Sequence, residues 1–151
     1  MTYKKKCDLA QNRNTPVKTL IALSKNKNEY IRYGVAKNPN TPVNILVTLS
    51  QDESSNVRYS VVENLSTPVD VLILLSKDEG FYVRYRVIQN PNTPVDILVV
   101  LSRDEHWLVK SNVARNPNTP VETLILLSED ENEYVRFYVA RNRNYINKIT
   151  E

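Results

Sequence analysis

Acidic and basic residues recur at one fixed distance along this 151-residue chain. Four aspartates each stand six residues before a basic residue: Asp52 and Arg58, Asp78 and Arg84, Asp104 and Lys110, and Asp130 and Arg136. A carboxylate beside a base could do general acid–base chemistry, but an active site needs one such pair rather than a copy in almost every segment. Arginine suits a paired carboxylate, because its planar guanidinium donates two parallel hydrogen bonds. We therefore expect a ladder of structural ion pairs between neighbouring segments.

Other reactive side chains are scarce. His106 is the only histidine and Cys7 the only cysteine. No nucleophile stands beside His106 and no second histidine could share a metal with it, so neither a triad nor a metal site is visible. One cysteine excludes an internal disulfide and a multi-cysteine metal site, and two glycines leave no phosphate-binding loop. We predict that the chain is not an enzyme and binds no cofactor or metal.

The elements that would position these residues form a tandem repeat. A Thr-Pro pair recurs every 26 residues, beginning at Thr15, Thr41, Thr67, Thr93 and Thr119. Counted from each threonine, apolar residues recur at positions 3, 6, 9, 17 and 21. A strict period of this size is typical of a solenoid, in which a unit too small to fold alone shares its core with its neighbours. We predict five full repeats in one domain.

Each repeat predicts two helices. Threonine is a favoured N-cap and proline suits the first helical turn, so a first helix of about ten residues, α or partly 3₁₀, would bury positions 3, 6, 7 and 9. A second helix at positions 15–23 would bury positions 17 and 21, which lie one turn apart. Asparagine at position 24 would end it in left-handed geometry. The fold class is all-α, a solenoid of helix–turn–helix repeats without strands.

The two ends depart from the repeat. Residues 1–14 match the second half of a repeat, with Lys5 where full repeats carry Ile or Val, which indicates an N-terminal half-repeat cap. The five full repeats then occupy residues 15–144 of a single domain spanning 1–151. Residues 145–151 are either a C-terminal cap or a truncated repeat, and stacking of chains through this end is one possible oligomeric arrangement.

The repeat frame resembles a known family. The pattern V-R-x-x-V-A-x-N-P-N-T-P-V-x-x-L-x-x-L-S-x-D is clearest over Val109–Asp130 and Val135–Asn144. It resembles the leucine-rich repeat variants, relatives of HEAT and armadillo arrays. The resemblance implies a right-handed superhelix, possibly alternating α and 3₁₀ helices, and a scaffold rather than one activity. A family member carries an iron–sulfur cluster on a cysteine-rich N-terminal segment, but with only Cys7 here that cofactor is not carried over.

The outer face of the second helices is the candidate binding surface. Positions 16, 19, 20 and 23 lie opposite the buried positions and carry aromatic and basic residues, a combination that suits recognition. Trp107, at position 15 of its repeat, is added to this face. The candidate partner-binding residues are then Tyr33, Tyr59, Tyr82, Tyr85, Arg86, Trp107, Arg115, Tyr138 and Arg141. Alternatively, the tyrosines pack sideways against the next repeat. Phe81 and Trp107 would be neighbours, either as a small apolar anchor or as a cover over the helix junction.

Charge separates two functional hypotheses. Residues 1–40 hold nine basic and two acidic residues, a net +7, which leaves −4 for the rest of a chain whose total is +3. The first hypothesis is a scaffold that binds another protein through the aromatic and arginine-bearing face. The alternative is nucleic-acid binding through the basic end and the same face, which the acidic remainder disfavours. We expect no membrane segment and no secretory signal, and hence a cytoplasmic protein.

Overall fold

The computed structural model describes residues 1–150, and all regular structure in this range is α-helical, with no strand. The chain divides into two compact units, one spanning Met1–Leu75 and one beginning at Ser76. The first unit contains α1 Tyr3–Gln11, α2 Val17–Leu23, α3 Glu29–Lys37, α4 Val43–Leu49, α5 Ser55–Glu63 and α6 Val69–Leu75. The second contains α7 Phe81–Val87, α8 Val95–Leu101, α9 Trp107–Arg115, α10 Val121–Leu127, α11 Glu133–Val139 and α12 Arg143–Ile149.

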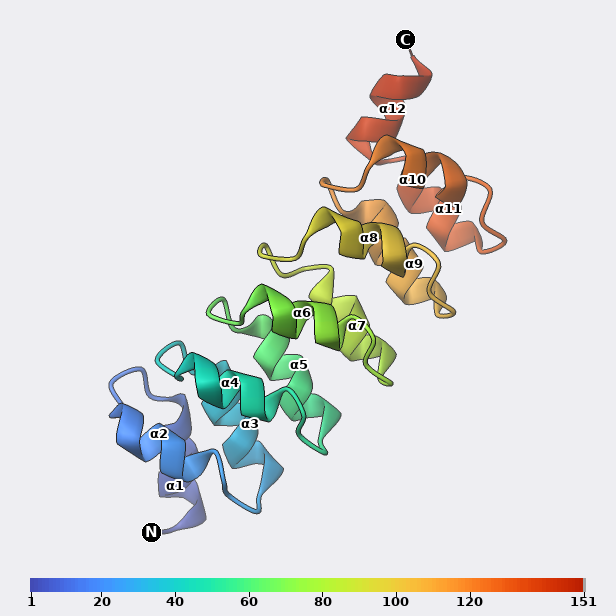
Figure 1. Cartoon of the computed structure of the whole chain (residues 1–151). Helices are drawn as coiled ribbons and strands as arrows, with labels where there is room; N and C mark the ends of the chain where they lie inside the picture. The colour runs from blue at the N-terminus through green and yellow to red at the C-terminus, as the bar shows by residue number, and fades with distance from the viewer. Residues whose placement is uncertain (151) are drawn as a thin grey trace. The chain divides into compact units, whose positions relative to one another are not determined.

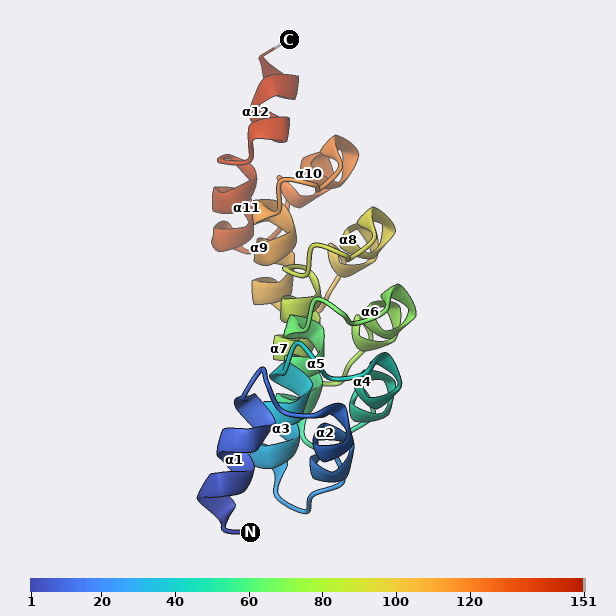
Figure 2. The same cartoon turned by 90° about the vertical axis from the view of Figure 1, so that its left-hand side faces the viewer.

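Each unit has two layers of helices (Figures 1 and 2). In the first unit, α2, α4 and α6 form one layer and α1, α3 and α5 the other. In the second, α8 and α10 lie opposite α7, α9 and α11. This is the predicted all-α architecture, one helix of each repeat in each layer. The single-domain prediction and the right-handed superhelix stay predictions.

The first helix of each repeat starts one residue later than expected. Proline, not threonine, is the N-cap residue of α2, α4, α8 and α10, and none of these caps makes a side-chain hydrogen bond. The threonine hydroxyl instead donates backwards, to a carbonyl near the end of the preceding helix: Thr15 to Leu9 at 2.6 Å and Thr119 to Val113 at 2.6 Å. The predicted N-cap role is therefore wrong. The hydroxyl adds a second hydrogen bond to a carbonyl at the helix end, since Val113 O, for example, also accepts the Asn116 N–H at 3.0 Å.

The short helices bury a different stripe from the one predicted. Each is seven residues long and α-helical, although the first turn of α2 also carries a 3₁₀-type bond from Thr19 N–H to Pro16 O. Positions 6 and 9 are buried as expected, but in the middle repeats positions 3 and 7 face outwards: Val95 is 45% and Val99 38% exposed. Position 5 is buried instead, as at Ile97. In an α-helix, positions 5 and 9 lie one turn apart beside position 6, whereas position 3 falls on the far side.

The second helices pack as predicted at positions 17 and 21. Val109, Val113, Val135 and Val139 are all at most 1% exposed, and each lies on the side facing the short helices and the adjacent repeat. Helices α3, α5 and α9 cover positions 15–23, as expected, while α7 and α11 end two residues earlier.

Asparagine at position 24 does not take the predicted left-handed conformation. Asn38 is extended, with φ −71° and ψ 125°, and no described non-glycine residue has positive φ. Its buried amide instead reaches the preceding repeat and donates to the carbonyls of Ala10 at 2.8 Å and Asn12 at 2.9 Å, while its oxygen accepts from Asn40 N–H. Asn142 makes the equivalent three bonds in the second unit. The asparagine thus joins neighbouring repeats by satisfying backbone groups that would otherwise be buried unpaired.

The end helices differ from those between them. In α1, Ala10 is fully buried and Lys5 is exposed, so the lysine that replaces an apolar residue meets solvent. Helix α12 begins at Arg143, capped by the Asn142 side chain, and has no buried residue. Across the described range, no helix is long and apolar enough to cross a membrane.

Candidate functional site

The predicted ion-pair ladder is present inside each unit. Arg32 donates two hydrogen bonds to Asp52, Nε at 2.6 Å and Nη2 at 2.8 Å, and Arg84 pairs with Asp104 in the same way at 2.6 and 2.9 Å. The partner is the aspartate of the next repeat, 20 residues on, as a ladder between neighbours requires. The bond to Asp104 raises the pKa of Arg84 above its ordinary value, against the opposing effect of burial. The pairs Arg32–Asp52 and Arg84–Asp104 therefore join neighbouring repeats.

The same aspartates place the start of each second helix. While one oxygen of Asp104 accepts from Arg84 Nε, the other also accepts the His106 N–H at 2.9 Å, and Asp130 accepts the Asn132 N–H at 3.0 Å. His106 then caps α9, because its Nδ1 accepts from Leu108 N–H at 3.2 Å. Loops that would otherwise be mobile are held at two points each. The aromatic residues that follow these loops are positioned by the ladder.

Those aromatics form a continuous line in the second unit, which we call the aromatic row: Tyr82, Phe81, His106, Trp107 and Tyr134. Successive ring centroids along the row are 4.1, 3.7, 6.3 and 5.2 Å apart, and Phe81 lies 4° from parallel with His106. The row crosses the N-terminal ends of α7, α9 and α11. Tyr82, Trp107 and Tyr134 are 62, 37 and 53% exposed. Three large rings therefore remain partly exposed, Tyr82 and Tyr134 with one ring neighbour each and Trp107 between His106 and Tyr134.

An acidic hollow adjoins the row between α9 and α11. It has a volume of about 380 Å³ and is lined by Glu105, His106, Trp107, Lys110, Glu131 and Asn132. Lys110 is neutralised by Asp130, with Nζ 2.6 Å from Oδ2. Glu105 lies 3.5 Å from Arg84, which is already paired with Asp104, and its side chain is 88% exposed. The two glutamates therefore give the hollow a net negative charge beside an indole face.

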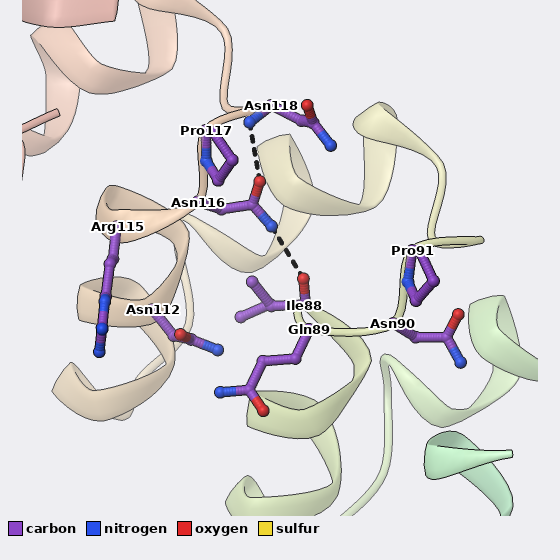
Figure 3. Close-up of a pocket in the computed structure, with 9 residues that line it drawn as sticks. All are labelled: Ile88, Gln89, Asn90, Pro91, Asn112, Arg115, Asn116, Pro117 and Asn118. Carbon is purple, nitrogen blue, oxygen red and sulfur yellow. Dashed lines mark hydrogen bonds between the residues drawn. The ribbon is translucent and has the colours of Figure 1, made fainter. Parts of the chain in front are cut away.

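A cationic groove lies at the opposite ends of the same helices. Arg115 borders both a hollow of about 430 Å³, whose rim Figure 3 shows, and a second of about 320 Å³ that it shares with Tyr138, Arg141 and Asn142. No acidic residue lines either hollow. The Arg115 guanidinium carbon is 5.9 Å from the Tyr138 ring centroid, and that of Arg141 is 3.5 Å from the ring of Phe137. Both arginines thus lie over rings, and neither has a carboxylate partner among residues 1–150.

The nine predicted site residues are distributed over both units. Tyr33 and Tyr59 lie in the first unit and the other seven in the second. Tyr82 and Trp107 belong to the aromatic row, whereas Arg115, Tyr138 and Arg141 meet around the cationic groove. Tyr85 and Arg86 are half-buried between them, and Tyr85 offers its carbonyl to the Asn112 amide at 2.9 Å. Position 16 is exposed in every repeat except at Leu108, which is half-buried, whereas position 19 is at least half-buried in every repeat except at Phe137.

In the first unit the predicted tyrosines have local partners. Tyr33 lies beside Lys37, whose Nζ is 5.8 Å from the ring centroid. Glu63, 3.4 Å from Lys37, raises the pKa of that lysine, with Tyr33 as the next cause. Tyr59 is half-buried on α5. No aromatic line comparable to the row appears among the ring contacts described in this unit.

His106 and Tyr134 were absent from the predicted set, and His106 is the residue that joins the row. Position 14 holds Asn, Ser, Gly, His and Asn in the five repeats, so its variation gave no sign of a ring contact. Phe81 and Trp107 were expected to be neighbours. The structure links them through His106, since Phe81 stacks on the imidazole and Trp107 lies 6.3 Å beyond it.

Comparison with known proteins supports the repeat assignment. A solved leucine-rich repeat variant with a novel repetitive structural motif is 32% identical to this chain over 85% of its length, with a TM-score of 0.71. The chain is thus similar to a leucine-rich repeat variant in both fold and repeat sequence, as the repeat frame predicted. It spans 52% of that structure's chain. An engineered protein of known structure matches 96% of this chain, over 90% of its own length, at 18% identity and a TM-score of 0.58, which is a likeness of fold alone. No protein-family profile and no curated protein sequence matches.

Proposed function

We propose that this chain is a non-catalytic scaffold that binds another protein through the aromatic row of its second unit. The observation that carries the proposal is the exposure of three rings in one line, at Tyr82, Trp107 and Tyr134. Tyrosine and tryptophan dominate binding hot spots because they bury a large area and lose little rotamer freedom. A cytoplasmic setting is part of the proposal and fits the single cysteine.

Rigidity of the row supports the proposal. Its rings follow loops that buried ion pairs and backbone hydrogen bonds hold in place, so little ordering entropy is lost when a partner binds. The row also crosses three consecutive repeats, which matches an extended segment of a partner better than a small molecule. The ladder of aspartate and basic residues gives the charges that recur in the repeats a structural role.

The test first uses the chain to isolate a partner protein and then measures how tightly that partner binds. Tagged chain would capture proteins from native lysate, and a captured protein would be purified and titrated by calorimetry against wild type and a Tyr82→Ala/Trp107→Ala/Tyr134→Ala variant. Each aromatic anchor that is removed should cost about 2–4 kcal/mol of binding free energy, so the triple variant should show no detectable binding. Tyr30→Ala is the matched control, because Tyr30 is 61% exposed at the same repeat position in the first unit. Unchanged affinity of the triple variant for every captured protein would refute the row as the binding surface.

A second candidate function, nucleic-acid binding, has one observation in its favour. Arg115 and Arg141 border hollows without any acidic lining residue, and aromatic rings stand beside both. Such a site would bind phosphates and lose affinity steeply with added salt. A fluorescent single-stranded oligonucleotide that binds equally well at low and high salt, or equally well to Arg115→Ala/Arg141→Ala, would exclude this function.

A further inference from the structure

We infer that the partner of the aromatic row is an extended, basic peptide segment, one of whose lysine or arginine side chains enters the acidic hollow beside Trp107. This inference rests on the proposed function and names the chemistry of its partner. It is drawn from the geometry and charge around the row, and it distinguishes the row from the cationic groove at the other ends of the helices.

The hollow has the parts that a long cationic side chain needs. Trp107 lines its wall, and an indole is the best aromatic partner for a cation. Lysine and arginine place their aliphatic stems along apolar surface and keep the charged head in a polar environment. With Glu105 and Glu131 also lining the hollow, the head would meet carboxylates where the stem leaves the ring.

The charges already present leave this position open for an added cation. The hollow's own base, Lys110, is 2.6 Å from Asp130, and Arg84 is held in two hydrogen bonds by Asp104. The Glu131 carboxylate forms no ion pair among the described residues, although Arg136 Nη1 donates to the Glu131 carbonyl at 2.8 Å, and Glu105 makes only the 3.5 Å contact with Arg84. An entering cation would therefore offset the net negative charge of the hollow, whereas that charge would repel an acidic peptide or a nucleic acid.

The row on either side of the hollow fits the rest of such a segment. Tyr134 continues from Trp107 at 5.2 Å, and Tyr82 is exposed at the far end beyond Phe81. Glu133 is exposed in the first turn of α11, beside Tyr134 in the chain. Further basic residues of the segment can therefore meet a second ring and a third carboxylate along the same line.

The experiment selects short random peptides displayed on phage against the full-length chain. Parallel selections use Trp107→Ala and Glu105→Gln/Glu131→Gln, with Asp96→Asn/Glu122→Gln as the matched control. Asp96 and Glu122 lie on α8 and α10, in the other layer of helices, so the control removes two charges away from the row. We expect wild type and control to select peptides enriched in lysine and arginine, and both row variants to lose that enrichment.

A selected peptide is then titrated by its effect on the emission of Trp107, the only tryptophan in the chain. Affinity should fall about five- to tenfold in Glu105→Gln/Glu131→Gln, and equally when the peptide's basic residues are replaced by glutamine, but change less than about twofold in the control. Peptides that depend on Trp107 but are not basic would overturn this inference and leave the proposed function standing. A selection that yields no Trp107-dependent peptide would overturn both.

Discussion

At the residue scale, individual polar side chains of this protein hydrogen-bond to main-chain groups, a role that their residue types alone do not reveal. Threonine, asparagine and aspartate at fixed repeat positions each hydrogen-bond to a main-chain group at a helix end, as Thr119 does with the Val113 carbonyl. Because such groups are expensive to bury unpaired, a small polar residue at a fixed position in every repeat is explained without any ligand. The residues left without such a role, chiefly the exposed rings of the aromatic row, are the better candidates for binding.

The buried ion pair of the second unit gives a residue-scale prediction. The side chains of Arg84 and Asp104 are 10 and 6% exposed, so Asp104→Asn leaves a buried guanidinium without its carboxylate. The free energy of unfolding should fall by about 3 kcal/mol, measured by urea denaturation. Because the pKa of Arg84 is raised, its charge and the stabilisation it brings are complete at neutral pH and are lost only at strongly alkaline pH.

The control for this prediction is Asp96→Asn, an exposed aspartate on α8 that removes the same charge. Its unfolding free energy should match wild type within about 0.5 kcal/mol. Equal losses in the two variants would show that net charge, rather than the pair with Arg84, accounts for the effect.

Close contact between α1 and α3 gives a second residue-scale prediction. A Cβ added at Gly34 would lie 2.9 Å from the Cβ of Ala10, and neither atom is at the end of a flexible side chain. Gly34→Ala gains about 0.5–1 kcal/mol of helix propensity but should lose about 1–3 kcal/mol by overpacking, so a net destabilisation is expected. Denaturation with urea measures it, and a variant more stable than wild type would mean that α1 can move away.

At the element scale, the short helices show how adjacent leucines differ. Leu75 at position 9 of its repeat is 2% exposed, whereas Leu74 is 49% exposed. Leu75→Ala should therefore lower the free energy of unfolding by about 2–5 kcal/mol, and Leu74→Ala by less than about 1 kcal/mol. Chemical denaturation of both variants measures the difference, and similar losses would contradict the placement of α6.

The second helices also bury one stripe of positions, and this decides which of their residues a partner could reach. Positions 17 and 21 are buried in all five repeats, which leaves position 16 outside, where Tyr82 and Tyr134 are exposed. A helix must bury one stripe, and its remaining stripes are free to vary with the partner. Helix periodicity therefore predicted which residues face solvent at position 16. It did not predict that position 20 turns toward the preceding repeat, as Asn112 does.

At the scale of the whole molecule, the unbroken 26-residue period predicts one cooperative transition. The only tryptophan, Trp107, lies in the second compact unit, so its fluorescence reports that unit, while far-ultraviolet circular dichroism reports helices of both. Because repeats are stabilised by their neighbours, we expect the two urea unfolding curves to superimpose. Separate midpoints would show that the two units unfold independently.

Periodicity and residue type were enough to predict the all-α repeat fold and its likeness to the leucine-rich repeat variants. They also predicted the buried positions 6, 9, 17 and 21 and the arginine–aspartate ladder. These follow from local rules, since a repeated apolar stripe can be buried only by stacking copies of itself. The role of Asn38 could not be predicted, because its amide bonds the preceding repeat, and the role of Thr15 was missed because its hydroxyl turns back to the preceding helix instead of capping the next one. The same holds for the aromatic row. His106 completes it only because tertiary packing brings position 14 of one repeat onto position 15 of the repeat before, and the acidic hollow exists only where Glu105 and Glu131 are held on either side of Trp107.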